Sequence, residues 1–206
     1  MHDLIDAIAA GESGIAQRLA ARPGAAAARM TQDLLVEAIP HWLYAGDTLL
    51  HLAAAALNVD AAAALLDAGA DVMAVGRRGT APLHYACDPR PTTETAWNPA
   101  QQVRVIELLI ARGASVDAQD KGGVTPLLRA VRSRSPVAVR ALLDAGADPR
   151  LANHSKTGST PLSLAKTSSG AGGTAGAGAL QREIIALLSA ALHEPPGGLG
   201  AEAAKA

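Results

Sequence analysis

Three stretches decide the fold: LLDAGAD at residues 65–71, LIARGASVD at 109–117 and LLDAGAD again at 142–148. A second phrase precedes each of them and also follows the last. It reads TLLHLA at 48–53, APLHYA at 81–86, TPLLRA at 125–130 and TPLSLA at 160–165. The final alanines of this phrase lie 33, 44 and 35 residues apart. Two phrases recurring with a period near 33 residues indicate an array of helical repeats.

Local signals place two antiparallel helices in each repeat. A polar N-cap residue followed by proline begins four expected helices, at Asn98-Pro99, Thr125-Pro126, Ser135-Pro136 and Thr160-Pro161. Gly69, Gly113 and Gly146 follow leucine-rich turns, and each fits the left-handed residue that ends a helix. The segments after these glycines are polar and turn-rich, which predicts hairpin-like fingers at 71–79, 117–123 and 148–158.

The phrases TPLLRA, PLHYA, TPLSLA and LLDAGAD resemble the signature phrases of ankyrin repeats over roughly residues 47–192. The resemblance implies an all-α solenoid of helix-turn-helix repeats with finger loops, a protein-binding role and no enzymatic activity. It also implies that His51 and His84 tie neighbouring backbone turns together.

The expected organisation has three parts. Residues 1–46 form a degenerate N-terminal helical cap and a connection, with Trp42 and Tyr44 folded over the cap. Four ankyrin-type repeats follow, at about 47–78, 79–121, 122–156 and 157–192. Longer spacing between the two helices of alternate repeats predicts insertions at 87–98 and 167–179, and residues 193–206 are expected to be a disordered tail.

Composition narrows the class of protein. Hydrophobic residues make up 49% of the 206 residues and aromatic residues only 2%, so alanine and leucine must build the core. The single cysteine, Cys87, excludes an internal disulfide and a cysteine-based metal cluster. No signal peptide or membrane span is expected, which favours a cytoplasmic location. The protein is also expected to be a monomer that does not bind membranes. Arginine outnumbers lysine 14 to 4, a bias typical of GC-rich bacterial genomes.

Charge is unevenly distributed along the chain. Residues 1–76 carry 3 basic and 9 acidic side chains, whereas residues 77–150 carry 11 basic and 7 acidic ones. Arg129 is read as occupying the place of the histidine in the repeat phrase, with Arg132 and Arg134 close by. The hypothesis is a basic groove for an acidic protein surface, and the alternative is a solvated face with local ion pairs. The predicted partner-binding residues are Arg77, Arg78, Arg90, Trp97, Arg129, Arg132 and Arg134.

Other readings of the chain are weaker. His84 and Cys87 share a helix face, but no orienting group or oxyanion site accompanies them, so no catalytic residue is predicted. The glycine-rich stretch 170–178 lacks a preceding strand and a terminal Lys-Ser/Thr, so it fails the phosphate-loop patterns. No metal, cofactor or nucleic-acid partner is expected. The prediction is a protein-interaction adaptor. Two alternatives stay open: a small-anion or nucleotide sensor, and an inhibitory or immunity subunit that neutralises a neighbouring enzyme or toxin.

Overall fold

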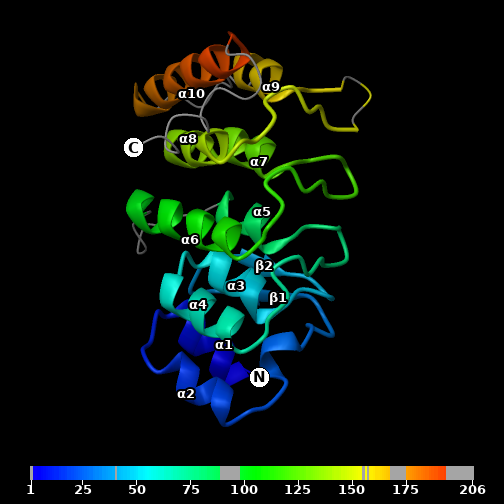
Figure 1. The fold of residues 1–206 in the computed structure, drawn as a ribbon, viewed down its shortest axis with the longest axis vertical. Helices are drawn as coiled ribbons and strands as arrows, with labels where there is room; N and C mark the ends of the chain where they lie inside the picture. The colour runs from blue at the N-terminus through cyan, green and yellow to red at the C-terminus, as the bar shows by residue number, and fades with distance from the viewer. Residues whose placement is uncertain are drawn as a thin grey trace, which may run out of the picture.

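The repeat phrases fold into pairs of antiparallel helices that stack along one axis (Figure 1). The computed structural model describes residues 2–39, 41–88, 98–154, 156, 158–167 and 175–193. The helices, in chain order, are α1 (His2–Ala9), α2 (Ile15–Ala20), the 3-10 turn η1 (Ala25–Ala27), α3 (Leu49–Ala55), α4 (Val59–Asp67), α5 (Pro82–Ala86), α6 (Pro99–Ala111), α7 (Pro126–Arg132), α8 (Pro136–Asp144), α9 (Pro161–Thr167) and α10 (Ala175–His193). The predicted all-α solenoid is confirmed.

The helices form two layers with the fingers along one side. The inner layer holds α3, α5, α7 and α9, and the outer layer holds α4, α6, α8 and α10, each helix touching its neighbour in the same layer (Figure 1). The cap helices α1 and α2 close one end of the stack against α3 and α4. The fingers project from the inner layer and comprise the first (residues 71–80), the second (115–124) and the third (148–159).

The predicted helix boundaries are confirmed at both ends. The side chain of Thr125 accepts a hydrogen bond from the N–H of Leu128, and Ser135 caps α8 in the same way. Gly69, Gly113 and Gly146 adopt φ values of 87°, 95° and 88°. Such left-handed angles favour glycine, so each of these residues stops its helix and turns the chain toward a finger.

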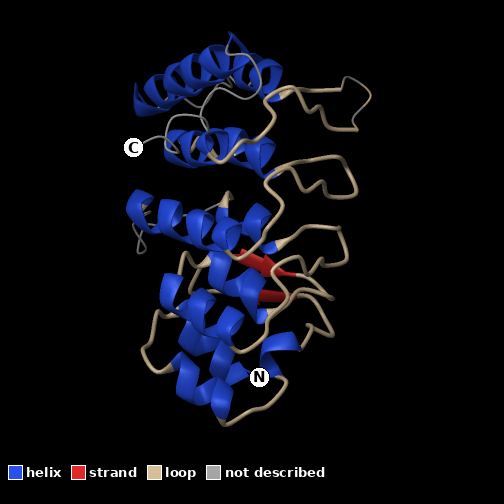
Figure 2. Cartoon of the chain, in the orientation of Figure 1, coloured by secondary structure: helices blue, strands red, loops and turns tan. Residues whose placement is uncertain are grey.

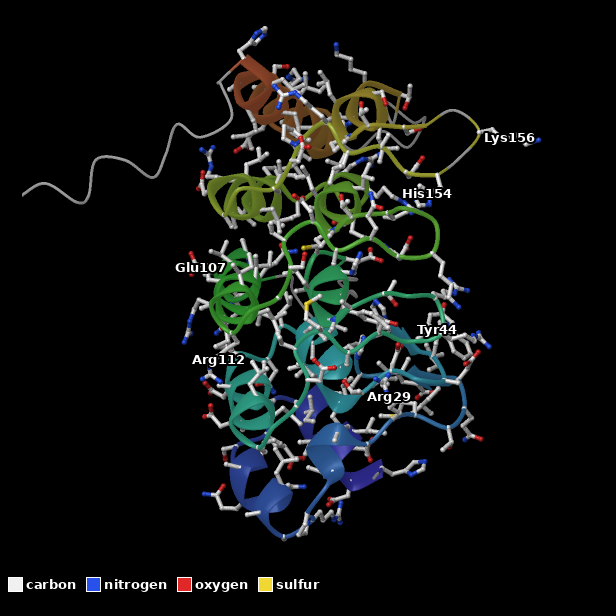
Figure 3. The ribbon with its side chains drawn as sticks, turned by 45° about the vertical axis from the view of Figure 1, so that its right-hand side comes forward. Arg29, Tyr44, Glu107, Arg112, His154 and Lys156 are labelled. Carbon is white, nitrogen blue, oxygen red and sulfur yellow. The ribbon has the colours of Figure 1, made fainter. Side chains whose placement is uncertain are left out.

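Backbone hydrogen bonds connect each finger to the loop before it, which for the first finger is the loop that contains Ala45. They run from the N–H of Arg77 to the carbonyl of Ala45, from Lys121 to Arg78 and from His154 to Gly122, with N···O distances of 3.2, 3.0 and 2.7 Å. At the start of the row, the Arg29 guanidinium donates to the carbonyls of Gly46 and Val75, both at 2.8 Å (Figure 3). The three bonds between successive loops join main-chain atoms. The stacking of the repeats therefore sets the spacing between neighbouring fingers.

Alanine and leucine build the core, as composition predicts. Ala53, Ala86 and Ala130 are completely buried at the same position of successive inner helices. Small side chains at these contacts allow short helices to pack closely. Leucines such as Leu65 and Leu142, also fully buried, fill the space between the two layers.

An antiparallel β-hairpin is a feature that the sequence reading missed. β1 (Leu34–Val36) pairs with β2 (His41–Leu43) in the stretch predicted only as a connection. The hairpin contacts α1 and α3 and lies on the finger side of the first repeat (Figure 2).

Part of the second predicted insertion is helical. Helix α10 begins at Ala175, so residues 175–179 are helical although the prediction placed them in the insertion. Most of the first insertion, residues 89–97, lies outside the described residues, as do 168–174 and 194–206.

Candidate functional site

A pocket of about 50 Å³ opens on the finger side, where the hairpin, the first finger and the inner helices meet. We call it the hairpin pocket. Its lining comprises His41, Trp42 and Tyr44 from the hairpin and the turn after it, Arg78 and Thr80 from the first finger, and His84, Tyr85, Asp88 and Arg129 from α5, its C-terminal end and α7. Segments from four parts of the chain therefore build one concave site.

The pairing of the hairpin decides which of its side chains reach solvent. Leu35 lies opposite Trp42 in the register, and Leu34 lies opposite Leu43. Leu43 is fully buried, whereas Leu35 and Trp42 are 40% and 45% exposed. Successive residues of a strand point to opposite faces, so one face packs on the core and the other presents an apolar pair beside the pocket.

Arg78 stands at the mouth of the pocket. Its guanidinium carbon lies 4.3 Å from the centre of the Tyr44 ring, a cation–π arrangement. The neighbouring Arg77 is 5.6 Å from the same ring and forms an ion pair with Asp33 at 2.9 Å. Arg78 has no ion pair within the part of the chain that the structure describes.

Arg129 is engaged in two ion pairs. Its guanidinium nitrogens lie 3.3 Å from an oxygen of Asp88 and 3.2 Å from one of Asp120. Asp120 also accepts hydrogen bonds from the N–H groups of Gly122 and Val124. Arg129 therefore joins the second finger to the end of α5, and its charge is largely balanced by these two carboxylates.

A buried carboxylate lies behind the pocket. Asp47 is fully buried, and one of its oxygens accepts hydrogen bonds from the N–H of Tyr44 at 2.7 Å and the hydroxyl of Tyr85 at 2.5 Å. Burial, followed by the charge of Asp47, raises the pKa of Tyr85 well above its ordinary value. The hydroxyl therefore stays protonated and remains a donor to Asp47.

The side chains of His51 and His84 connect the backbones of successive repeats. Nδ1 of His51 accepts from the N–H of Thr48, and Nε2 lies 3.0 Å from the carbonyl of Thr80 in the next repeat. His84 has the same arrangement toward Val124, at 2.9 Å. Burial lowers the pKa of both histidines, that of His84 to about 4. The structural role implied for these histidines is confirmed.

The His84–Cys87 arrangement does not favour a reactive thiol. Cys87 is fully buried, and burial raises the pKa of its thiol. A buried, protonated thiol is a poor nucleophile. His84, in turn, uses both ring nitrogens in backbone contacts.

The structure separates the arginines that the sequence reading grouped together. Arg78 and Arg129 both line the hairpin pocket. Arg132, exposed, ends α7, and Arg134, with a left-handed φ of 54°, lies in the turn after it, at the opposite end of the helix from the fingers. Arg90 and Trp97 lie outside the described residues.

The proposed alignment of Arg129 with the repeat histidine is wrong. Leu128 occupies that position and is buried, and its N–H binds the Thr125 side chain. Arg129 instead corresponds to Tyr85, one residue further along the inner helix, which explains why both side chains line the pocket.

A row of basic residues at the finger tips also escaped the sequence reading. Arg77, Lys121 and Lys156 each stand two residues before a left-handed glycine of their finger. Figure 3 shows Lys156 at the tip of the third finger. Aligning the fingers on these glycines would have revealed the row. The hairpin residues Trp42 and Tyr44 gave no comparable signal.

Comparison with known proteins decides the family. A sequence model of ankyrin repeats in three copies matches residues 95–174, and a model of a single ankyrin repeat matches residues 45–77. The chain belongs to the ankyrin-repeat family. The ankyrin match begins immediately after the hairpin, so β1 and β2 lie outside the matched repeats.

Several curated proteins share the ankyrin region. Protein PhlB of Serratia liquefaciens is 35% identical over 142 residues, which cover 67% of this chain and 54% of PhlB. The Neurogenic locus Notch protein of Drosophila melanogaster is 36% identical over 104 residues, covering 50% of this chain and 3% of that protein. Human Neurogenic locus notch homolog protein 2 is 38% identical over 104 residues, covering 50% and 4%. The chain thus spans about half of PhlB and a small part of each Notch protein.

The described residues contain neither a membrane-spanning helix nor a cluster of metal ligands. No helix there is long and apolar enough to cross a membrane. No group of three or more His, Cys, Asp or Glu side chains there could hold a metal ion.

Proposed function

We propose that this ankyrin-repeat protein is an adaptor that binds an acidic segment of a partner protein along its finger side. Ankyrin repeats are general protein-interaction modules, which supports a protein-binding role. The sign of the partner's charge and the face that it contacts are the parts of the proposal that go beyond the family.

The observation that carries the proposal is a series of cations on successive fingers. Arg78, Lys121 and Lys156 are exposed and have no ion pair within the described ranges. Adjacent helix pairs pack about 10 Å apart, so these charges follow one another along the finger side. An extended segment with acidic residues could meet several of them together.

Three carboxylates near these cations are already paired. Asp33 pairs with Arg77, and both Asp88 and Asp120 pair with Arg129. Their charges are therefore offset locally, whereas Arg78, Lys121 and Lys156 have no ion pair among the described residues. Complementary charge of this kind raises association rates and helps to exclude unsuitable partners.

A peptide selection with a charge-matched control tests the proposal. Random peptides displayed on phage would be selected on the full chain, and the selected peptides should be enriched in Asp and Glu. Their affinity should fall sharply in the variant R78E/K121E/K156E and also as salt is raised. The control variant R104E/R140E/R182E carries the same change in net charge on the outer helices and should bind as the parent does.

Two outcomes would contradict the proposal. One is a selected pool with no acidic bias. The other is an equal loss of binding in the finger variant and in the outer-helix variant, which would show that net charge, rather than the fingers, controls binding.

The proposal also includes the oligomeric state and location of the protein and a binding role for its first insertion. We also propose that the protein is a monomer acting in the cytoplasm, and light scattering during gel filtration would test the monomeric state. Replacing residues 88–97 with a short turn tests the contribution predicted for Arg90 and Trp97.

A further inference from the structure

The polar groups on the inner wall of the hairpin pocket are already committed. The Tyr85 hydroxyl donates to Asp47, and Nε2 of His84 binds the carbonyl of Val124. A ligand that needed these groups would have to break buried hydrogen bonds, which is costly. Recognition must therefore come from the mouth of the pocket.

Arg78 supplies free donors at that mouth. Its guanidinium carbon lies 4.3 Å from the centre of the Tyr44 ring, and in the described part of the chain the guanidinium has no carboxylate partner. The contact with the ring occupies no N–H group with a hydrogen-bond acceptor, so an N–H edge remains available. That edge matches the two oxygens of a carboxylate.

The remaining charges of the pocket do not oppose an anion. Asp88 lines the pocket, but its carboxylate lies 3.3 Å from the guanidinium of Arg129. The positive charge of Arg78 would repel an incoming cation at the mouth, and the described lining residues offer no unpaired carboxylate that could bind it. The pocket therefore favours a negative group.

An apolar rim adjoins the mouth. Leu35 and Trp42 form a cross-strand pair on the outer face of the hairpin, and both are exposed. Trp42 also lines the pocket, so the rim and the mouth are continuous. Tryptophan and arginine together are typical of residues that dominate binding energy at protein interfaces.

We infer that the hairpin pocket receives an acidic side chain of the partner protein, paired with Arg78, while an adjacent nonpolar side chain packs on Trp42 and Leu35. This inference rests on the proposed function, since it assumes a protein partner. It adds a two-residue specificity, an acid beside an apolar residue, at one defined place. The hairpin that creates the place is not part of the matched repeats.

Short capped peptides test the inference directly. The probes are N-acetyl-Leu-Glu-amide and N-acetyl-Glu-Leu-amide, each compared with the version that carries Gln in place of Glu. Amidated ends ensure that only a side-chain carboxylate is offered. Binding to the full chain would be followed by 15N NMR through the Trp42 indole N–H and the Arg78 Nε–H. The chain has two tryptophans, so Trp97→Phe assigns the Trp42 indole signal.

Glu peptides should bind about 10-fold more tightly than Gln peptides, the ratio expected for one charge-assisted pair. Arg78→Gln should abolish this ratio. Arg77→Gln is the matched control because Arg77 occupies the same finger but pairs with Asp33, so the ratio should be retained. Replacing the probe's Leu with Ala should weaken binding to the parent chain but not to Trp42→Ala. All three changed residues are exposed, and the NMR spectrum reports whether each variant is folded.

The outcomes separate this inference from the proposed function. Equal affinity for Glu and Gln peptides, or a ratio that persists in Arg78→Gln, would overturn the pocket assignment. If Glu peptides shifted only signals of Lys121 and Lys156, the acidic-partner proposal would stand and the pocket would not. If the pocket bound Glu peptides but the phage selection showed no acidic bias, the pocket would stand and the wider proposal would fail.

Discussion

The burial of His84 makes the stability of the stack sensitive to acid. Its ring lies between α5 and the second finger, where Nδ1 accepts from the N–H of Ala81 and Nε2 donates to the carbonyl of Val124. A second proton would have to be placed on Nδ1, which has no acceptor there. Burial is the main reason that the pKa of His84 falls from 6.5 to about 4.

The sign and size of the effect follow from that difference. In the unfolded chain His84 takes up a proton as pH falls through 6.5, whereas in the folded chain it stays neutral until about pH 4. Proton binding therefore favours the unfolded state across this window, and stability falls as pH is lowered. At pH 5 the free energy of unfolding should be lower by about 2 kcal/mol than at pH 8, and the full loss below pH 4 is about 3 kcal/mol. His51, whose pKa is also lowered by burial, adds to the effect in the same direction.

Urea unfolding followed by circular dichroism at pH 8 and pH 5 measures this loss. The control is His84→Leu, because the third repeat carries Leu128 at the equivalent position. This variant should be less stable at both pH values, yet it should lose about 2 kcal/mol less than the parent between them. The same pH-dependent loss in the parent and in His84→Leu would refute the reasoning, whatever their absolute stabilities.

Four further predictions concern the buried network and the repeat joints. Tyr85→Phe should lower the free energy of unfolding by about 2 kcal/mol, because Asp47 loses its hydroxyl donor; an unchanged urea midpoint would contradict this. Gly76→Ala should cost a similar amount, about 2 kcal/mol, since a Cβ there would lie 1.8 Å from Oδ1 of Asp47; a melting temperature equal to that of the parent would show that the carboxylate can move aside. Gly146→Ala should cost about 1 kcal/mol, from its left-handed φ of 88° alone, because no atom lies within 4 Å of the added carbon; a loss well above that would mean a hidden clash. Leu128 cannot make the histidine tie to the next finger, so amide hydrogen exchange should be faster in α9 and α10 than in α5; equal protection would count against the importance of the ties.

The sequence predicts the repeats because their signals are local. A proline after an N-cap residue and a glycine after a leucine-rich turn act within one helix, and the structure confirms them at Thr125 and Gly146. The histidine ties could also be predicted, since His51 and His84 occupy the same place in a recurring phrase. Because the phrase recurs, a role assigned to a residue in one repeat supports the same role at the equivalent position of the next repeat.

The hairpin could not be read from the chain in the same way. Leu34, Leu35 and Val36 are all apolar, so the alternation that marks a half-buried strand is absent. The pairing of β1 with β2 depends on packing against α3, a contact made only after folding.

The pocket could not be predicted either, because it depends on contacts between residues that are far apart in the sequence. Arg129 pairs with Asp88, 41 residues away, and with Asp120, 9 residues away. The sequence shows the three charges but not that they neutralise one another. The same is true of Arg78: that it has no carboxylate partner among the described residues becomes visible only once the fingers are stacked.

The hairpin also gives the finger side a fixed beginning. It packs on α3, and its His41 ring lies 4.9 Å from that of Tyr85, so it stands at the cap end of the finger row. The last pocket residue along the chain is Arg129, so duplication of the third repeat (about residues 122–156) during evolution would add a finger beyond the pocket without disturbing it. Descendants of differing length could therefore read longer or shorter partner segments while keeping the same starting residue. The hairpin would fix one end of the bound segment, and the number of repeats would set how long that segment is.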